Sequence, residues 1–135
     1  MEKLKAIFVG ALLGLPIAAN AQATGSVNGG YIVGGGLGAT ECPGFLESLG
    51  KARAEKPGST GYPGELQGFA MYVSGFQTAY NLQTPDTCDI FAGSNTSQVL
   101  DWLETFCRAH PDSRFGAGVI ALARERYPTR SKKCG

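Results

Sequence analysis

The chain has 135 residues, 43% of them hydrophobic and 17% charged, which predicts one small domain with a core of its own. Its 12 basic and 11 acidic residues nearly balance, and no basic stripe runs along the sequence. This excludes the electrostatic pattern of a nucleic-acid-binding protein, and we interpret the cationic cluster Arg130, Lys132 and Lys133 as a solvated tail.

Residues 1–23 have the layout of a secretory signal peptide. Two lysines precede an apolar run from Ala6 to Leu15, and small-x-small cleavage sites end at Ala21 and Ala23. The run is well short of the ~20 residues that span a bilayer. We therefore expect export, cleavage without a remaining membrane anchor, and a periplasmic or secreted location. Cleavage removes two basic residues and one acidic residue, which leaves ten of each.

Residues 24–39 are expected to form a flexible, glycine-rich leader. Seven residues between Thr24 and Gly38 are glycine, which makes ordering of the backbone entropically costly. The run from Gly34 to Gly38 is not interpreted as a phosphate-binding loop, because the lysine of such a loop is missing.

Residues 40–135 are expected to form a helical domain with a short basic tail. The first helix should begin near Pro43 and end around Ala54, ahead of a loop rich in turn-forming residues. The second should run from Glu65 to about Gln83, where apolar side chains recur every three or four positions.

Glycines and aromatic residues share the second predicted helix. Gly68 and Gly75 each weaken it by roughly 1 kcal/mol relative to alanine, and we expect a neighbouring helix to approach closely at both. The apolar stripe is interpreted as core rather than as the lining of a ligand pocket. Its aromatic members are Phe69, Tyr72, Phe76 and Tyr80.

The third helix should begin after Asn95, which can cap it together with Gln98. Asn95-Thr96-Ser97 is also a glycosylation sequon, but we interpret Asn95 as a cap. Pro111 cannot continue this helix, yet it suits the first position of a new one. A fourth helix is therefore expected from Pro111, with Asp112 in its first turn, up to Tyr127. Its predicted buried stripe is Phe115, Val119, Leu122 and Ala123.

All four cysteines, Cys42, Cys88, Cys107 and Cys134, lie in the part expected to be exported. An even number in a small exported chain predicts two disulfides, for which three pairings are possible. A zinc site is the alternative, because Cys107 and His110 have ligand spacing, but no second half-site completes it. We therefore expect no metal ion and no other cofactor. His110 is interpreted as a junction residue whose remaining interest is as a pH-titrating group.

No nucleophile, base and orienting group can be assembled from the sequence. A single histidine carries little acid–base chemistry alone, and the paired carboxylates fall in a loop or on a solvated helix side. These pairs are Asp86 with Asp89 and Asp101 with Glu104. We assign no catalytic residue and expect a protein that is not an enzyme.

Three stretches resemble HdeA-like exported bacterial proteins. TECPGFLESL (Thr40 to Leu49) looks like the opening cysteine helix of that family, and YVSGFQTAYN (Tyr72 to Asn81) resembles its glycine-aromatic helix. VLDWLETFCRAHPDSRFGAGVIALARE (Val99 to Glu125) resembles the closing helix pair, with a cysteine before a proline corner. The related type VI amidase immunity family (Rap/Tai) has a similar glycine-aromatic helix and helix pair.

The resemblance implies an all-α, HdeA-like bundle of about four helices, stapled by disulfides. It also implies that Cys42 is bridged to Cys107, which leaves Cys88 and Cys134 to pair with each other. The expected function is that of a non-enzymatic exported binding protein, including an immunity-type inhibitor of a cell-wall hydrolase, with another protein or a second copy as partner. The alternative is an acid-stress holdase chaperone. The second bridge, the leader and the tail after Pro128 depart from those chaperones, and two covalent loops should resist opening in acid.

Overall fold

The computed structural model describes residues 30–55 and 62–135, so the expected signal peptide and the start of the leader lie outside this part. Within it the chain is all-α, which confirms the predicted fold class. The described residues from Ile32 onward form one compact unit. No helix in the described part is long and apolar enough to cross a membrane. The elements in chain order are η1 (Gly36–Ala39), α1 (Cys42–Ala54), α2 (Tyr62–Gln83), α3 (Thr96–Ala109), α4 (Phe115–Arg126) and η2 (Tyr127–Thr129).

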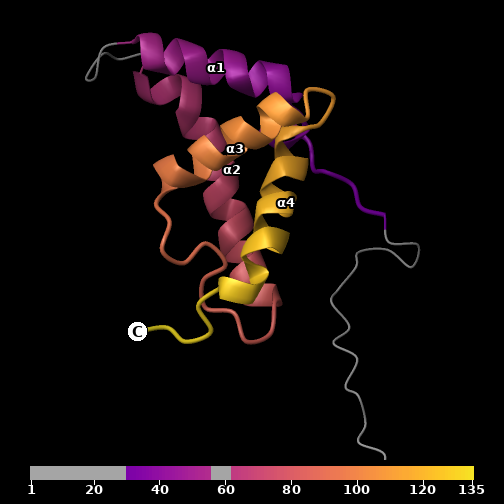
Figure 1. The fold of residues 1–135 in the computed structure, drawn as a ribbon, viewed down its shortest axis with the longest axis vertical. Helices are drawn as coiled ribbons and strands as arrows, with labels where there is room; N and C mark the ends of the chain where they lie inside the picture. Colours follow the sequence, from indigo (N-terminus) through magenta and orange to yellow (C-terminus); the bar gives the residue numbers. More distant parts are fainter. Residues whose placement is uncertain (1–29, 56–61) are drawn as a thin grey trace, which may run out of the picture. The chain divides into compact units, whose positions relative to one another are not determined.

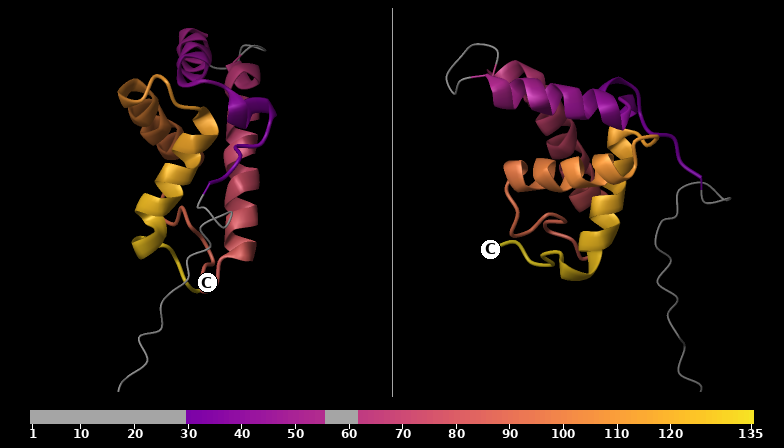
Figure 2. Two further views of the ribbon diagram at one scale, coloured as in Figure 1. Left: turned by 90° about the vertical axis from the view of Figure 1, so that its right-hand side faces the viewer. Right: turned by 45° about the horizontal axis from the view of Figure 1, so that its top comes forward.

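Four α-helices pack around one core in the compact unit (Figure 1). α1 contacts both α2 and α3, and α3 contacts α4. Two further views show α1 lying across one end of α2, while α2 and α4 both extend away from it (Figure 2). The largest fully buried side chains are Phe45, Phe91, Phe115, Ile90, Leu103, Leu122, Val119, Cys42 and Cys107.

Three phenylalanines join α1, α2 and α4 inside this core. The ring centroids of Phe45, Phe69 and Phe115 lie 4.7 to 5.1 Å apart, with edge-on or tilted planes. Such geometries suit the charge distribution of aromatic rings and contribute about 0.5–1.5 kcal/mol per pair beyond area burial. Phe69 is therefore a core residue, as the periodicity of α2 predicts.

Two disulfides connect distant parts of the chain. Cys42 at the start of α1 is bonded to Cys107 near the end of α3, and both residues are fully buried. Cys88, in the loop between α2 and α3, is bonded to Cys134 in the tail. This is the pairing that the resemblance implies. Two disulfides in so small a chain indicate an oxidising, exported environment.

The start of α3 follows its local sequence signal. Asn95 is the N-cap, and its side chain accepts a hydrogen bond from the backbone N–H of Gln98 at 2.9 Å. The Gln98 side chain accepts one in return from the Asn95 backbone N–H at 2.9 Å. This reciprocal capping box confirms the interpretation of Asn95 as a cap.

The start of α4 corrects the prediction made from Pro111. The helix begins at Phe115, so Pro111 and Asp112 lie in the turn before it rather than in its first turn. The reason is a long-range backbone pairing. Ser113 accepts a hydrogen bond from the N–H of Cys42 at 2.9 Å, and the N–H of Phe115 donates to Thr40 at 2.8 Å. Arg114 stays extended between these two bonds, and the helix starts directly after it, at Phe115.

Residues 32–39, which we call the strap, differ from the expected flexible leader. Residues 36–39 form η1, and η1 contacts both α2 and α4. Gly38 is buried under the ring of Tyr72, where an added methyl group would collide with that ring. The compact unit therefore begins at Ile32 rather than at residue 40. A few apolar side chains are enough to hold the strap on the helices, because its glycines let the strap backbone approach them closely.

The glycines of α2 were expected to meet a neighbouring helix. At Gly68 an added methyl group would collide with the side chain of Leu37, so the close neighbour is the strap. At Gly75 no atom lies within 4 Å of the added methyl group. The prediction is therefore wrong for Gly75, which faces open space.

The tail after α4 is anchored to the loop between α2 and α3. The Arg130 guanidinium lies 3.8 Å from the ring centroid of Tyr127 and donates a hydrogen bond to the Thr87 hydroxyl at 2.9 Å. Ser131 pairs with Asp89 through an antiparallel backbone bridge. Arg130 therefore differs from the solvated side chain expected of the tail, whereas Lys132 and Lys133 are exposed.

Candidate functional site

The histidine singled out by the sequence lies at the corner between α3 and α4. His110 is the C-cap of α3, its backbone N–H donates to Phe106 at 2.9 Å, and its exposed ring lies 4.6 Å from the Phe106 ring. The sulfur of Cys107 belongs to a disulfide and is not a free thiolate ligand. Among the described residues no group of three or more His, Cys, Asp or Glu side chains could hold a metal ion.

Replacing His110 with alanine should leave folding and metal content unchanged. The imidazole contributes only a ring contact at the exposed end of α3, so its loss should change the unfolding free energy by about 0.5 kcal/mol or less. Thermal melting and elemental analysis of the purified oxidised protein measure both properties. Stoichiometric zinc that is lost in the His110→Ala variant would contradict this expectation.

Three of the four carboxylates considered as acid–base pairs, Asp89, Asp101 and Glu104, take part in structural contacts. Asp89 accepts hydrogen bonds from the Gln77 side chain at 2.7 Å and from the Phe91 backbone at 3.0 Å. Glu104 forms ion pairs with Arg53 of α1 at 2.8 Å and with Arg108 at 2.7 Å. Asp101 and Glu104 of α3 are thus linked to α1 through Arg53, and their geometry is that of a surface ion-pair network.

The Glu104 network should make stability depend on pH. The hydrogen bond from Arg53, and then that from Arg108, lowers the pKa of Glu104 below its ordinary value of 4.5. A lowered folded-state pKa stabilises the fold above the unfolded-state value, and this stabilisation is lost as the pH falls through the folded-state value. Glu104→Gln should therefore cost about 1 kcal/mol or less at neutral pH, and the difference from the wild type should shrink as the pH falls below 4.5 and through the lowered folded-state pKa of Glu104.

Urea unfolding of both proteins between neutral pH and about pH 3 measures this difference. Glu47→Gln is the matched control, because the Glu47–Lys51 pair is exposed and lies within α1 alone. Its loss should leave the contact between α1 and α3 intact. A difference between wild type and Glu104→Gln that stays constant down to about pH 3 would contradict the assignment.

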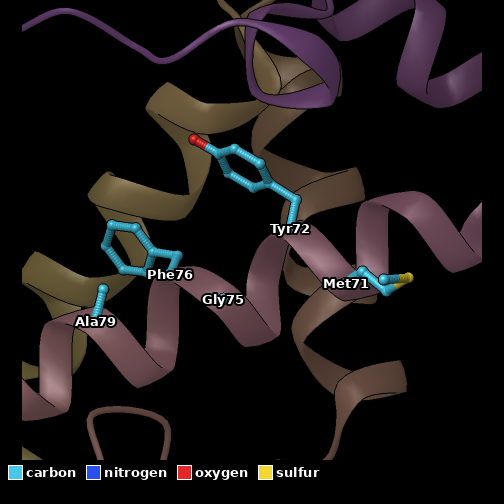
Figure 3. Close-up of a pocket in the computed structure, with 5 residues that line it drawn as sticks. All are labelled: Met71, Tyr72, Gly75, Phe76 and Ala79. Carbon is cyan, nitrogen blue, oxygen red and sulfur yellow. The ribbon is translucent and has the colours of Figure 1, made fainter.

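The surface of α2 offers the clearest candidate for binding. A shallow, mainly apolar pocket of about 370 Å³ lies on this helix. Its floor is open at Gly75, and Figure 3 shows Tyr72 and Phe76 on one side of the helix and Met71 on the other. Burial raises the pKa of the Tyr72 phenol, which therefore stays neutral at physiological pH. The lining residues are Met71, Tyr72, Gly75, Phe76 and Ala79.

No charged residue interrupts this surface among the α2 side chains that the structure describes. Met71 is 66% exposed and Leu82 is 78% exposed. We call the exposed positions together the α2 face. They are Gly64, Gln67, Met71, Ser74, Gly75, Thr78, Ala79, Leu82 and Gln83.

The aromatic stripe of α2 serves both the core and this face. Phe69 is buried, whereas Tyr72 and Phe76 are half-buried, pack against the core and line the pocket. The apolar periodicity of the sequence predicts the buried side of α2 correctly. It does not predict that Met71 and Leu82 are exposed. The signal that could have found the face is the absence of any charge from Leu66 to Gln83.

No protein-family model, curated protein or solved structure matches this chain. The candidate site is therefore interpreted from its own geometry. Away from the α2 face, all four cysteines lie in disulfides and Glu104 lies in ion pairs. Asn95 and His110 cap the two ends of α3.

Proposed function

We propose that the protein is a non-enzymatic, exported binding protein of HdeA-like fold that contacts a partner protein through the α2 face. The observation that carries this proposal is the uncharged, apolar pocket around Gly75. Interface cores are depleted of charged residues and enriched in methionine and aromatic residues. A pocket of this kind accepts a side chain of the partner, which is where binding energy concentrates.

Gly75 gives a partner room to approach α2, and the pocket around it distinguishes it from Gly50, an equally open glycine of α1. A glycine inside a helix costs about 1 kcal/mol relative to alanine. In the described part of the chain no atom beyond the backbone of α2 and the neighbours of Gly75 lies within 4 Å of a Cβ added there, so packing inside the chain does not offset this cost. Close approach of a partner backbone or side chain gives the glycine a function.

The specific form that we propose is a periplasmic immunity-type inhibitor of a cell-wall hydrolase. The resemblance of Tyr72–Asn81 and Val99–Glu125 to the amidase immunity family supports it, and the first of these stretches contains much of the α2 face. An exported amidase encoded beside this gene is the partner to test first. Its hydrolysis of peptidoglycan should fall when the purified protein is added.

Gly75→Leu tests the face itself, because a Cβ at this position meets open space and the leucine side chain occupies the pocket. Inhibition should weaken by about 30-fold or more, as for an interface hot spot. Gly50→Leu is the matched control, since Gly50 is an exposed helical glycine of α1 with no atom within 4 Å of an added methyl group. Equal inhibition by both variants would contradict the proposed face. If the partner is a second copy, Gly75→Leu alone should convert a dimer to a monomer in sedimentation.

An acid-stress holdase is the second candidate, and the Glu104 ion pairs between α1 and α3 favour it. These pairs weaken as the carboxylate is protonated, which loosens one contact of the bundle in acid. A holdase should then gain dye-binding apolar surface and lose oligomers near pH 3, whereas an immunity protein should keep both unchanged. The two disulfides oppose such opening, so we rank this function second.

A further inference from the structure

The two disulfides differ sharply in their access to solvent. Cys42 and Cys107 are 0% exposed and lie inside the core, whereas Cys134 is exposed and Cys88 is half-buried. Disulfides are reduced by direct attack of a thiolate on one of the two sulfur atoms, so the rate depends on access to that atom. A thiol can reach Cys134 in the folded protein, but it can reach the core disulfide only after unfolding.

The surroundings of Cys134 favour the approach of a thiolate. Lys132 and Lys133 precede it, and both are exposed. Positive charge near a cysteine stabilises thiolates and attracts anionic thiols. The core around the buried pair contains no buried charged residue among the described positions.

Backbone bonds hold the two cysteines together independently of the disulfide. The N–H of Cys88 donates to Ser131 at 2.8 Å, and the N–H of Ser131 donates to Asp89 at 2.9 Å. The Ser131 hydroxyl donates to the carbonyl of Lys133 at 2.8 Å. Opening of the disulfide therefore changes the tail locally, leaves the helices packed, and keeps the two thiols close enough to be oxidised again.

We propose that Cys88–Cys134 is a thiol–disulfide exchange site that reacts in the folded protein, whereas Cys42–Cys107 is closed to exchange. The reacting partner is a thiolate, supplied either by a dithiol oxidoreductase of the exported compartment or by a small thiol such as glutathione. This inference does not depend on the α2 face or on the proposed function.

The exchange balances as a two-electron reduction. The thiolate attacks the Sγ atom of Cys134, a mixed disulfide forms, and Cys88 leaves as a thiolate that takes up a proton. The second thiol of the oxidoreductase then attacks the sulfur of the first cysteine of the same enzyme in the mixed disulfide. This step releases Cys134 as a thiol. The dithiol ends as a disulfide, and Cys88 and Cys134 end as thiols. With glutathione, a second molecule performs the second step.

Opening this disulfide removes the covalent link between the tail and the loop from Pro85 to Ser94. Asp89 of that loop accepts a hydrogen bond from Gln77 on α2, next to Phe76 of the pocket. The exchange site is thus connected to α2 through one loop. Its redox state sets how firmly that loop is held.

Graded thiol treatment of the folded, full-length exported protein tests the proposal. Reduced glutathione and a purified dithiol oxidoreductase are added separately, the reaction is stopped by alkylation, and the labelled peptides are mapped. Cys88 and Cys134 should be alkylated at least about tenfold faster than Cys42 and Cys107 in both arms, at a rate proportional to thiol concentration. An oxidoreductase that lacks its second cysteine should be trapped as a mixed disulfide on Cys134.

Three outcomes would overturn the proposal. The first is opening of both disulfides at the same rate, and the second is a rate for Cys88–Cys134 that does not depend on thiol concentration, because both indicate that global unfolding is required. The third is trapping on Cys88 instead of Cys134. The Cys88→Ser, Cys134→Ser variant provides the matched control, since its remaining Cys42–Cys107 disulfide should resist both reductants in the folded state.

Discussion

Replacing Cys42 and Cys107 together with alanine should lower the melting temperature much more than replacing Cys88 and Cys134. The sequence separations of 65 and 46 residues give each loop closure a value of about 4 kcal/mol on the chain-entropy model, with a few tenths between them. Loop length therefore does not decide the ranking. The position of each disulfide in the fold decides it.

The buried pair contributes packing in addition to the constraint on the unfolded chain. Removal of its two sulfur atoms leaves voids in the core, at about 1 kcal/mol each. Loss of the exposed pair leaves the tail held by hydrogen bonds alone, so the residues after Ser131 gain freedom in the native state, and this gain of entropy offsets part of the gain in the unfolded chain. The first variant should melt at least about 15 °C below the wild type, and the second should lose clearly less. Equal losses in calorimetry would contradict the ranking.

Gly116→Ala should destabilise the protein by about 1–3 kcal/mol and release the strap. The added methyl carbon would lie 2.5 Å from Val33 Cγ1, 2.7 Å from the Tyr72 hydroxyl and 2.9 Å from the carbonyl oxygen of Gly38. All three distances are shorter than carbon contacts in folded proteins. One of these three atoms belongs to the strap backbone, so side-chain rotation alone cannot relieve the clash.

Urea unfolding and amide hydrogen exchange measure the two effects of this substitution. Exchange should accelerate at the Thr40 N–H, which donates to Leu37 of the strap. It should also accelerate at the N–H groups of Cys42 and Phe115, which pair residues 40–42 with the segment before α4. Gly50→Ala is the control, because alanine there meets no atom within 4 Å and should stabilise α1 by up to about 1 kcal/mol. The free energy of unfolding should therefore fall in Gly116→Ala and rise in Gly50→Ala. A rise in Gly116→Ala would show that the strap does not depend on this glycine.

The features that the sequence predicts well are those that depend on neighbouring residues. The capping box of α3 joins Asn95 to Gln98, and the buried stripe of α4 repeats at helical spacing, so both can be recognised without knowing the fold. The start of α4 cannot be recognised in this way. Pro111 satisfies the local rule for a first helical residue, but pairing with residues 40–42, far away in the sequence, keeps Arg114 extended and delays the helix to Phe115.

The strap and the α2 face were missed for a related reason. A glycine-rich segment predicts flexibility unless the helices that receive it also carry glycines, and Gly68 and Gly116 do so at positions that only the fold brings together. Gly68 and Gly75 are alike in the sequence, yet one meets Leu37 and the other meets open space. The uncharged run of α2 was visible from the start, but its exposed side depends on where the other elements pack.

The order of the cysteines along the chain has a consequence for biogenesis. The two disulfides interleave, because Cys88 lies between the partners of one and Cys107 between the partners of the other. A chain that emerges from a translocation channel presents Cys42 and Cys88 first, so an oxidase that joins cysteines as they arrive makes a pair that the native fold does not contain. Correct pairing requires either that the helices assemble before oxidation or that a disulfide isomerase reshuffles the early product. The yield of this protein is therefore set by whether folding precedes oxidation and, where it does not, by the isomerase capacity of the compartment into which the chain is exported.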